Sequence, residues 1–174
     1  DRDGNLYTTV VIDDKEWIVE NLRTTHYADG SPIPNLPDCN DRETPGQIYG
    51  PLYNWYAATY NAGGANIAPP GWHVPSNAEL LTLVNTLGGA PVAGDALKET
   101  GEVYWEVGNT GTNTSGFTAL GSGYREVTGN FGDTRISTFL HSTENYVFGG
   151  DGGLVLLYIN AYIKNHVKTC GSMV

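Results

Sequence analysis

The residues best suited to bind a partner lie near the end of the chain. Between positions 146 and 166 the sequence gathers aromatic, amide and other polar side chains, namely Tyr146, Phe148, Asp151, Tyr158, Asn160, Tyr162, Asn165 and His166. Tyrosine gives a large rigid contact area at low conformational cost, and asparagine gives adaptable hydrogen bonds, a mixture that binding loops use. In a strand over 154–163, alternation places Tyr158, Asn160 and Tyr162 on one face. We interpret this stretch as a binding face, and its alternative is the ordinary outer face of a sheet.

A histidine beside a tryptophan raises the question of catalysis, because histidine titrates near neutral pH. Trp72 and His73 stand between Gly71 and Val74-Pro75. No serine or cysteine nucleophile motif accompanies them, and Gly-x-Ser-x-Gly does not occur. We therefore predict that Trp72 belongs to the core and that His73 bonds to nearby backbone. No catalytic residue is predicted.

Metal-binding patterns are weak in this chain. Residues 1–5, Asp-Arg-Asp-Gly-Asn, begin like a calcium loop, but position 12 holds Ile12 where an EF-hand needs a bidentate glutamate. A leader to a hairpin is the better interpretation. Calcium-dependent sugar sites need a Glu-Pro-Asn or Gln-Pro-Asp loop, and Pro34 and Pro37 lack the required preceding residue. The sequence predicts no metal and no cofactor.

The two cysteines, Cys39 and Cys170, are far apart and form no Cys-x-x-Cys motif. This spacing argues against a zinc or redox site. A disulfide requires Cα atoms within about 7 Å. A disulfide and two separate thiols therefore both remain open.

Charge and length limit the classes of partner. The net charge is −10 and the nine Lys and Arg residues are scattered, which argues against nucleic acid. No apolar run approaches the roughly 20 residues that span a membrane, so this domain is not expected to insert directly. The chain has no signal peptide and begins at Asp1, as a mature fragment would. Its 174 residues suit one domain covering 1–174.

Local patterns predict the elements that position these residues. Residues 5–20 read as a β-hairpin turning at Asp13-Asp14-Lys15, and residues 28–46 read as loop. Residues 49–60 fit either a strand or a short helix. Ser76 and Glu79 form a capping box for a helix that ends at Gly88-Gly89. Its predicted apolar face consists of Leu80, Leu81, Val84 and Leu87.

The second half of the chain predicts a second short helix over 93–100, ending at Gly101. Residues 101–143 read as short strands and long loops rich in Gly, Asn and Thr, and 154–159 has strand length and apolar character. Glu20, Asn21 and Arg125 are polar residues of a buried type. We expect them to bond loop backbone, because a loop-rich fold must satisfy many such groups.

Six sequence blocks occur together in one order. They are Trp17-x-x-Glu20-Asn21-Leu22, Tyr27-x-Asp29-Gly30-x-Pro32-Ile33-Pro34, Leu52-Tyr53-Asn54-Trp55-Tyr56-Ala57-Ala58, Gly71-Trp72-His73-Val74-Pro75-Ser76, Leu97-Lys98-Glu99-Thr100-Gly101, and Gly116-Phe117-Thr118-Ala119-Leu120 with Gly123-Tyr124-Arg125. In this order they resemble the major paralogous domain (FISUMP) family of bacterial surface proteins. The resemblance covers nearly the whole chain.

The resemblance implies an α+β, C-type lectin-like fold with small antiparallel sheets, flanking helices and extensive ordered loops. It implies an extracellular or cell-surface location, with export or lipid anchoring through upstream sequence. The end of the chain also resembles C-type lectin-like variable proteins diversified by retroelements, whose last strands and loops form a variable face. These resemblances favour a non-enzymatic adhesion module for an unknown protein or glycan ligand.

Two alternatives remain open. The domain is a structural interaction module within a larger surface protein, or it is a degenerate relative of the formylglycine-generating enzymes. The enzyme reading depends on a pair of active-site cysteines, and Cys170 has no cysteine near it in sequence.

Overall fold

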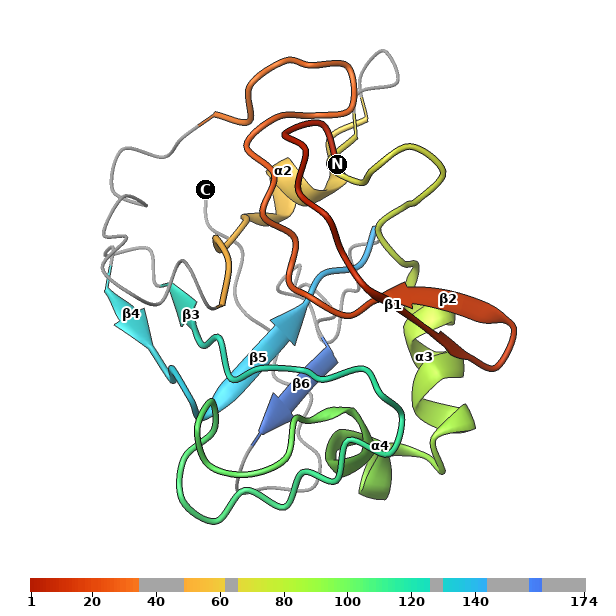
Figure 1. The fold of residues 1–174 in the computed structure, drawn as a ribbon, viewed down its shortest axis with the longest axis vertical. Coiled ribbons are helices and arrows are strands. Elements are labelled where there is room, and N and C mark those ends of the chain that lie inside the picture. The colour runs from red at the N-terminus through yellow and green to blue at the C-terminus, as the bar shows by residue number, and fades with distance from the viewer. Residues whose placement is uncertain (35–48, 62–65, 126–129, 144–156, 161–174) are drawn as a thin grey trace, which may run out of the picture.

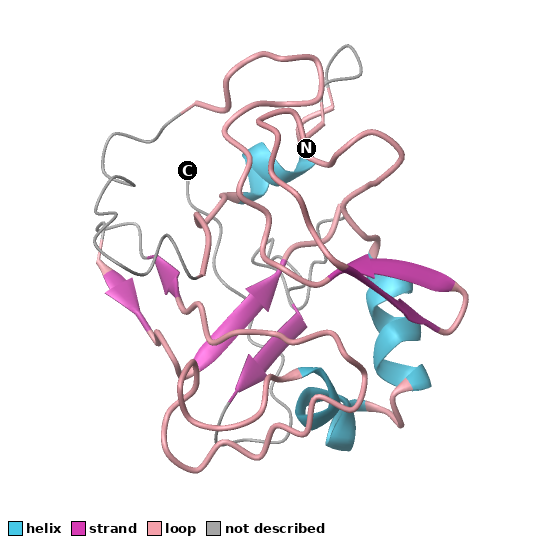
Figure 2. Cartoon of the chain, in the orientation of Figure 1, coloured by secondary structure: helices cyan, strands magenta, loops and turns pink. Residues whose placement is uncertain are grey.

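A computed structural model describes residues 1–34, 49–61, 66–125, 130–143 and 157–160. The described elements are β1 (Thr9–Ile12), β2 (Lys15–Ile18), α2 (Trp55–Thr59), α3 (Asn77–Thr86), α4 (Ala90–Leu97), β3 (Tyr124–Arg125), β4 (Phe131–Gly132), β5 (Ser137–Leu140) and β6 (Leu157–Asn160). Within these ranges the strands form three two-stranded antiparallel sheets, and loops connect most elements (Figure 2). The fold is mixed α+β.

The predicted hairpin is confirmed. β1 pairs with β2 from Thr9 opposite Ile18 to Ile12 opposite Lys15. Asp13 adopts the left-handed φ of 59° that a tight hairpin turn requires. The prediction placed Lys15 in the turn. The turn needs only two residues, so Lys15 belongs to β2 instead.

Helix α3 begins and ends at the residues that the sequence indicated. The Ser76 side chain accepts from the backbone N–H of Glu79, and the Glu79 side chain accepts from the backbone N–H of Ser76. At the other end Gly89 N–H donates to Val84 C=O at 2.9 Å, and Gly88 N–H donates to Asn85 C=O at 3.1 Å. These two bonds form a Schellman motif that satisfies the last carbonyls of the helix.

The predicted apolar face of α3 was wrong at one position. Leu81 is 60% exposed, whereas Leu80, Leu83 and Val84 are buried. The buried stripe follows the i, i+3, i+4 spacing that starts at Leu80, and Leu81 lies about 100° away around the axis. With leucines at 80, 81 and 83, only the tertiary contacts decide which pair faces inward.

Helix α4 lies three residues earlier than predicted, from Ala90 to Leu97. Pro91 is tolerated because the first turn needs no N–H donor. The helix ends at Leu97 because Lys98 becomes extended and bridges Ala119 in parallel. Helix propensity beyond Leu97 is therefore overridden by pairing with a distant segment.

Within 49–60 the structure selects the helix. Asn54 caps α2, and its side chain accepts from the backbone N–H of Ala57 at 2.8 Å. This cap satisfies the Ala57 backbone N–H, which in a strand would bond to a neighbouring strand.

The main core is assembled from distant parts of the chain. Its buried residues are Ile12, Leu83, Leu97, Trp105, Phe117 and Ala119. Trp105 is fully buried, and its indole N–H donates to Ala119 C=O at 2.9 Å. Tyr27 and Ile67 form a second, smaller cluster. This smaller cluster also contains the partly buried Leu22, Ile33, Tyr53 and Val74.

The strand pairs β3–β4 and β5–β6 lie next to each other. In Figure 1, β5–β6 runs near the middle of the view, with β3–β4 on one side and the β1–β2 hairpin with α3 on the other. β3 contacts β5 directly. Gly123, just before β3, has a φ of +68°, and a Cβ there would lie 2.3 Å from the Gly132 carbonyl oxygen. Only glycine allows this close approach.

Among the described residues, no single helix has the length and apolar character needed to cross a membrane. α3 and α4 reach that length only when counted together, and they are bent by 90° at the break between them.

Candidate binding face

Strand β6 carries two of the eight predicted binding residues. β6 pairs antiparallel with β5, and Tyr158 lies opposite Phe139 while Asn160 lies opposite Ser137. Directly opposed residues share a face of the sheet. Tyr158 and Asn160 are therefore on one face, in agreement with the alternation in the sequence. The other six, Tyr146, Phe148, Asp151, Tyr162, Asn165 and His166, lie outside the described residues.

The described part of that face is aromatic and tightly packed. Phe139 is half-buried, and its ring meets the Tyr124 ring edge-on with centroids 5.8 Å apart. The Tyr124 ring also crosses Gly132 of β4, where an added Cβ would lie 2.9 Å from Cζ. Ser137 is fully buried. Aromatic contacts thus hold β3 against β5 beside the backbone position of Tyr158.

The opposite face of β5 points to the core. Leu140 packs against the main core cluster. Thr138 is buried, and its hydroxyl lies 2.8 Å from that of Ser122. Leu157 and Ile159 pair with Leu140 and Thr138, on the face that the alternation predicts to be an apolar floor.

The Trp72–His73 pair differs from both predictions. Trp72 is only half-buried and belongs to neither core cluster, whereas Trp105 lies in the main core. His73 Nε2 lies 3.1 Å from each carboxylate oxygen of Glu79, so its partner is a side chain and not the backbone. The His73 side chain is 70% exposed. An exposed pair of this kind contributes little to stability. In the contacts described, His73 meets Glu79, and the Ser76 hydroxyl bonds that carboxylate and not His73.

The carboxylates of the leader are already engaged by the protein. Asp1 Oδ2 accepts from the Asn5 amide at 2.9 Å and the Tyr7 hydroxyl at 2.5 Å. Asp3 accepts from the backbone N–H and, at 2.9 Å, the hydroxyl of Thr25, and it lies 2.5 Å from His26 Nδ1. The Thr25 N–H and His26 together hold the pKa of Asp3 at about 2 against some opposition from burial. These bonds fasten the leader to the 23–26 segment, as a hairpin leader requires.

In the part of the chain that the structure describes, no three His, Cys, Asp or Glu residues are placed to hold a metal ion. Cys39 and Cys170 both lie outside that part. The structure therefore does not test whether Cys39 and Cys170 form a disulfide or a cysteine pair of the formylglycine-generating type.

Two polar sites in the interior were missed from sequence. Lys98 is 1% exposed, and its Nζ lies 3.0 Å from Asp95 Oδ1 and 3.3 Å from the Thr110 hydroxyl. His141 Nε2 lies 2.8 Å from Tyr53 C=O, and burial lowers the pKa of its imidazole. The spacing of Asp95 and Lys98, three apart within the helix predicted over 93–100, was the available signal for the ion pair. His141 gives no local signal, because its partner is 88 residues away.

The expected role of the polar scaffold residues is confirmed for two of them. Glu20 accepts from the backbone N–H of Thr8 at 2.7 Å, and the Asn21 amide donates to Tyr49 C=O at 2.7 Å. Arg125 stacks over the Phe131 ring, 5.6 Å from its centroid. Arg135, which the sequence did not single out, donates to Glu102 C=O at 2.6 Å and Trp105 C=O at 2.9 Å.

The comparison with known families decides the relationship. The Fibrobacter succinogenes major domain matches residues 10–148, which is most of the chain. This chain belongs to that family. No curated protein and no solved structure matches it. The family's description names a domain and no catalytic activity, and membership is compatible with a non-enzymatic surface module.

The boundaries of the Fibrobacter succinogenes major domain divide the predicted binding residues. Tyr146 and Phe148 fall within the matched range, and the other six, from Asp151 to His166, follow it. β5 lies inside the match and β6 lies beyond it. The last sheet therefore joins a strand of the family domain to a strand from the segment that follows.

Proposed function

We propose that this member of the Fibrobacter succinogenes major domain family is a non-enzymatic binding module on a cell surface, with a C-type lectin-like architecture. Its binding face is formed by the segment from Tyr146 to His166. The observation that carries the proposal is the pairing of β6 with β5, which places Tyr158 and Asn160 on one face of a sheet anchored in the family domain.

The internal contacts of the scaffold support a binding role for the C-terminal segment and a structural role for the sequence blocks. Several polar groups of the sequence blocks are occupied by internal bonds, such as those from Thr8 to Glu20 and from Asn21 to Tyr49. Groups used in this way are unavailable to a partner, since each is already satisfied within the fold. The tyrosine- and asparagine-rich segment beyond residue 148 is the part with the composition of a binding surface.

The ligand is a protein or a glycan on a cell surface, and the segment varies between paralogues through a retroelement. An array of glycans and host surface proteins, probed with the wild-type chain and with Tyr158→Ala/Tyr162→Ala, tests the proposal. Tyr60→Ala is the matched control, because Tyr60 is 45% exposed and lies outside the segment. Binding by wild type and Tyr60→Ala, lost at least tenfold in the double variant, is expected.

Equal binding by all three chains would overturn the placement of the face. Close paralogues provide an independent test of variability. Substitutions spread evenly over the chain, instead of concentrated between about 146 and 167, would remove the retroelement proposal while leaving the binding proposal intact.

A second candidate, a structural module that packs against neighbouring domains, is favoured by exposed aliphatic side chains in one loop. Val103 and Val107 are 72% and 74% exposed. Apolar side chains exposed together often mark a contact surface. This role would be supported if the loop is labelled in the isolated domain and protected from labelling in the full-length protein.

A further inference from the structure

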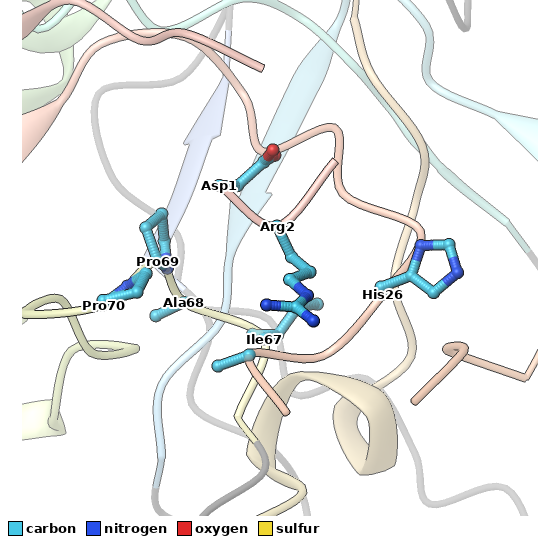
Figure 3. A pocket seen from close by; sticks show the side chains of 8 residues that line it. Asp1, Arg2, His26, Ile67, Ala68, Pro69 and Pro70 are labelled. Carbon is cyan, nitrogen blue, oxygen red and sulfur yellow. The ribbon is translucent and has the colours of Figure 1, made fainter. Parts of the chain in front are cut away.

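A small cavity lies far from β6. It is formed where the first residues of the chain meet residues 26–28 and 67–70. Its volume is about 230 Å³, and Asp1, Arg2, His26, Ala28, Ile67, Ala68, Pro69 and Pro70 line it (Figure 3). Asp1 and Arg2 precede residue 10, where the family match begins. The cavity therefore combines residues inside and outside the family domain.

The cavity has one wall of apolar side chains, and the Arg2 side chain lies beside it. Ile67 and Ala68 are 3% and 7% exposed, and Pro69 and Pro70 continue the same wall. Figure 3 shows the Arg2 guanidinium extending over Ile67. Among the residues described, the Arg2 side chain has no hydrogen bond or ion pair, although acidic residues outnumber basic ones by 19 to 9 in this chain. Its charge does act on Asp29, whose pKa is lowered mainly by the bonds from Ser31 and to a smaller extent by Arg2.

The exposed Arg2 side chain lies close to Gly30. Gly30 has a φ of +89°, and a Cβ there would lie 3.0 Å from Arg2 Nη2 and 3.3 Å from Nε. Arg2 therefore rests against bare backbone. Ala28 N–H donates to Asn66 C=O at 2.8 Å, which joins the two sides of the cavity. A site whose walls are bonded in advance loses less entropy on binding.

The acidic groups nearby are largely occupied. Each Asp1 carboxylate oxygen accepts two hydrogen bonds, and Asp3 is held by Thr25 and His26. Asp29 Oδ1 accepts from the N–H and the hydroxyl of Ser31. His26 uses Nδ1 for Asp3, so Nε2 is the ring nitrogen left for a ligand.

We propose that this cavity binds a small monocarboxylate with an apolar body. Arg2 holds the carboxylate, because the planar guanidinium fork matches two carboxylate oxygens. The hydrocarbon part lies on the wall formed by Ile67, Pro69 and Pro70. A monocarboxylate fits better than a phosphate, since Asp1 and Asp29 repel a dianion more strongly. A half-open site of this size implies weak binding, with a Kd on the order of 1 mM.

N-acetyl-leucine and its neutral amide, N-acetyl-leucinamide, test the proposal, because they differ only in the carboxylate. Both are titrated into the ¹⁵N-labelled 174-residue chain. N-acetyl-leucine is expected to shift the Arg2 side-chain resonance and the Ala28, Ile67 and Ala68 amides saturably. The amide is expected to bind at least tenfold more weakly.

Three variants complete the experiment, each checked for an unchanged spectrum elsewhere. Arg2→Gln is expected to weaken binding at least tenfold, and Arg2→Lys to an intermediate degree because the charge remains without the fork. Arg125→Gln is the control, an arginine of β3 outside the cavity, and is expected to bind as wild type. The proposal would be overturned by equal binding of the two compounds or by wild-type binding of N-acetyl-leucine to Arg2→Gln. It would also be overturned by the absence of saturable shifts at 50 mM, or by tighter binding of methyl phosphate.

Discussion

Glu79 shows how one carboxylate can join separate parts of the chain. It accepts from the backbone N–H and the hydroxyl of Ser76, both at 2.9 Å, and it meets His73. Lys15 of the hairpin lies 3.6 Å away. The Ser76 N–H is the main cause of a pKa held at about 2, with His73 adding to it and burial opposing it. The ionised form is therefore the one that the folded state stabilises.

This pKa predicts the direction of acid destabilisation. Because the folded-state pKa of Glu79 lies below its ordinary value of 4.5, the stabilisation is complete above pH 4.5 and is lost as the pH falls towards 2. Asp3 acts in the same direction from its ordinary 3.8. Glu79→Gln should therefore show a shallower decline of the free energy of unfolding over this range, measured by urea titration at several pH values.

His73→Gln is the control for this prediction. It removes the exposed ion pair and keeps the Ser76 bonds, so its pH profile should stay close to that of wild type. A Glu79→Gln profile as steep as the wild-type profile would show that the carboxylate does not carry the effect.

At this scale the sequence was informative where partners are close along the chain. Ser76 and Glu79 are three residues apart, and their capping box was predicted correctly. The partner of His73 was predicted wrongly, because six residues and a change from loop to helix separate it from Glu79. The contact between His141 and Tyr53 could not be found locally at all.

Among the elements, α3 is defined at both ends by local chemistry. Its C-terminal Gly88 has a φ of +93°, and a Cβ there would lie 2.8 Å from Val92 Cγ2. The close contact belongs to the junction with α4. Gly88 is therefore required both for its conformation and for the space it leaves.

Gly88→Ala is expected to lower the free energy of unfolding by about 2 kcal/mol or more, from the left-handed conformation plus the contact with Val92. Gly71→Ala measures the cost of the left-handed conformation alone, since Gly71 has a φ of +86° and nothing lies within 4 Å of its added Cβ. Its loss should be about 1 kcal/mol. Chemical denaturation measures both, and an equal loss in the two variants would contradict the contribution of the contact.

The elements also show the limit of local patterns. The end of α3 was predicted because Gly88 and Gly89 terminate it through bonds to its own last turn. The end of α4 was predicted three residues late, because Lys98 leaves the helix to bridge Ala119. Periodicity carries no information about a partner 21 residues ahead.

The whole molecule depends on a core that no single segment forms. Ile12 and Leu83 come from a hairpin and a helix, and Trp105 and Phe117 come from the long connection between α4 and β3. Trp17 adds an edge-on contact with Phe117 at 6.1 Å between centroids. Removing one contributor therefore loosens the others.

This shared core predicts that the chain unfolds as one cooperative domain. Tryptophan fluorescence, which reports on all four tryptophans including the buried Trp105, and far-UV circular dichroism should give coincident transitions in urea. The reason is that the hairpin and α3 cannot lose their contacts while the core around Trp105 stays intact. Two separated transitions would contradict a single domain over 1–174.

The sequence by itself determined the family, the hairpin, both ends of α3 and the identity of the segment with a binding composition. Each of these rests on residues within a few positions of one another, or on blocks read in order. The tertiary structure alone decided which leucines of α3 face inward, where α4 ends, and that Trp105 and not Trp72 fills the core. It also brought Arg2 close to Gly30 and into the lining of the same cavity as Ile67. The physical reason is that burial and pairing between distant segments outweigh local preference, and local preference is all that a sequence pattern records.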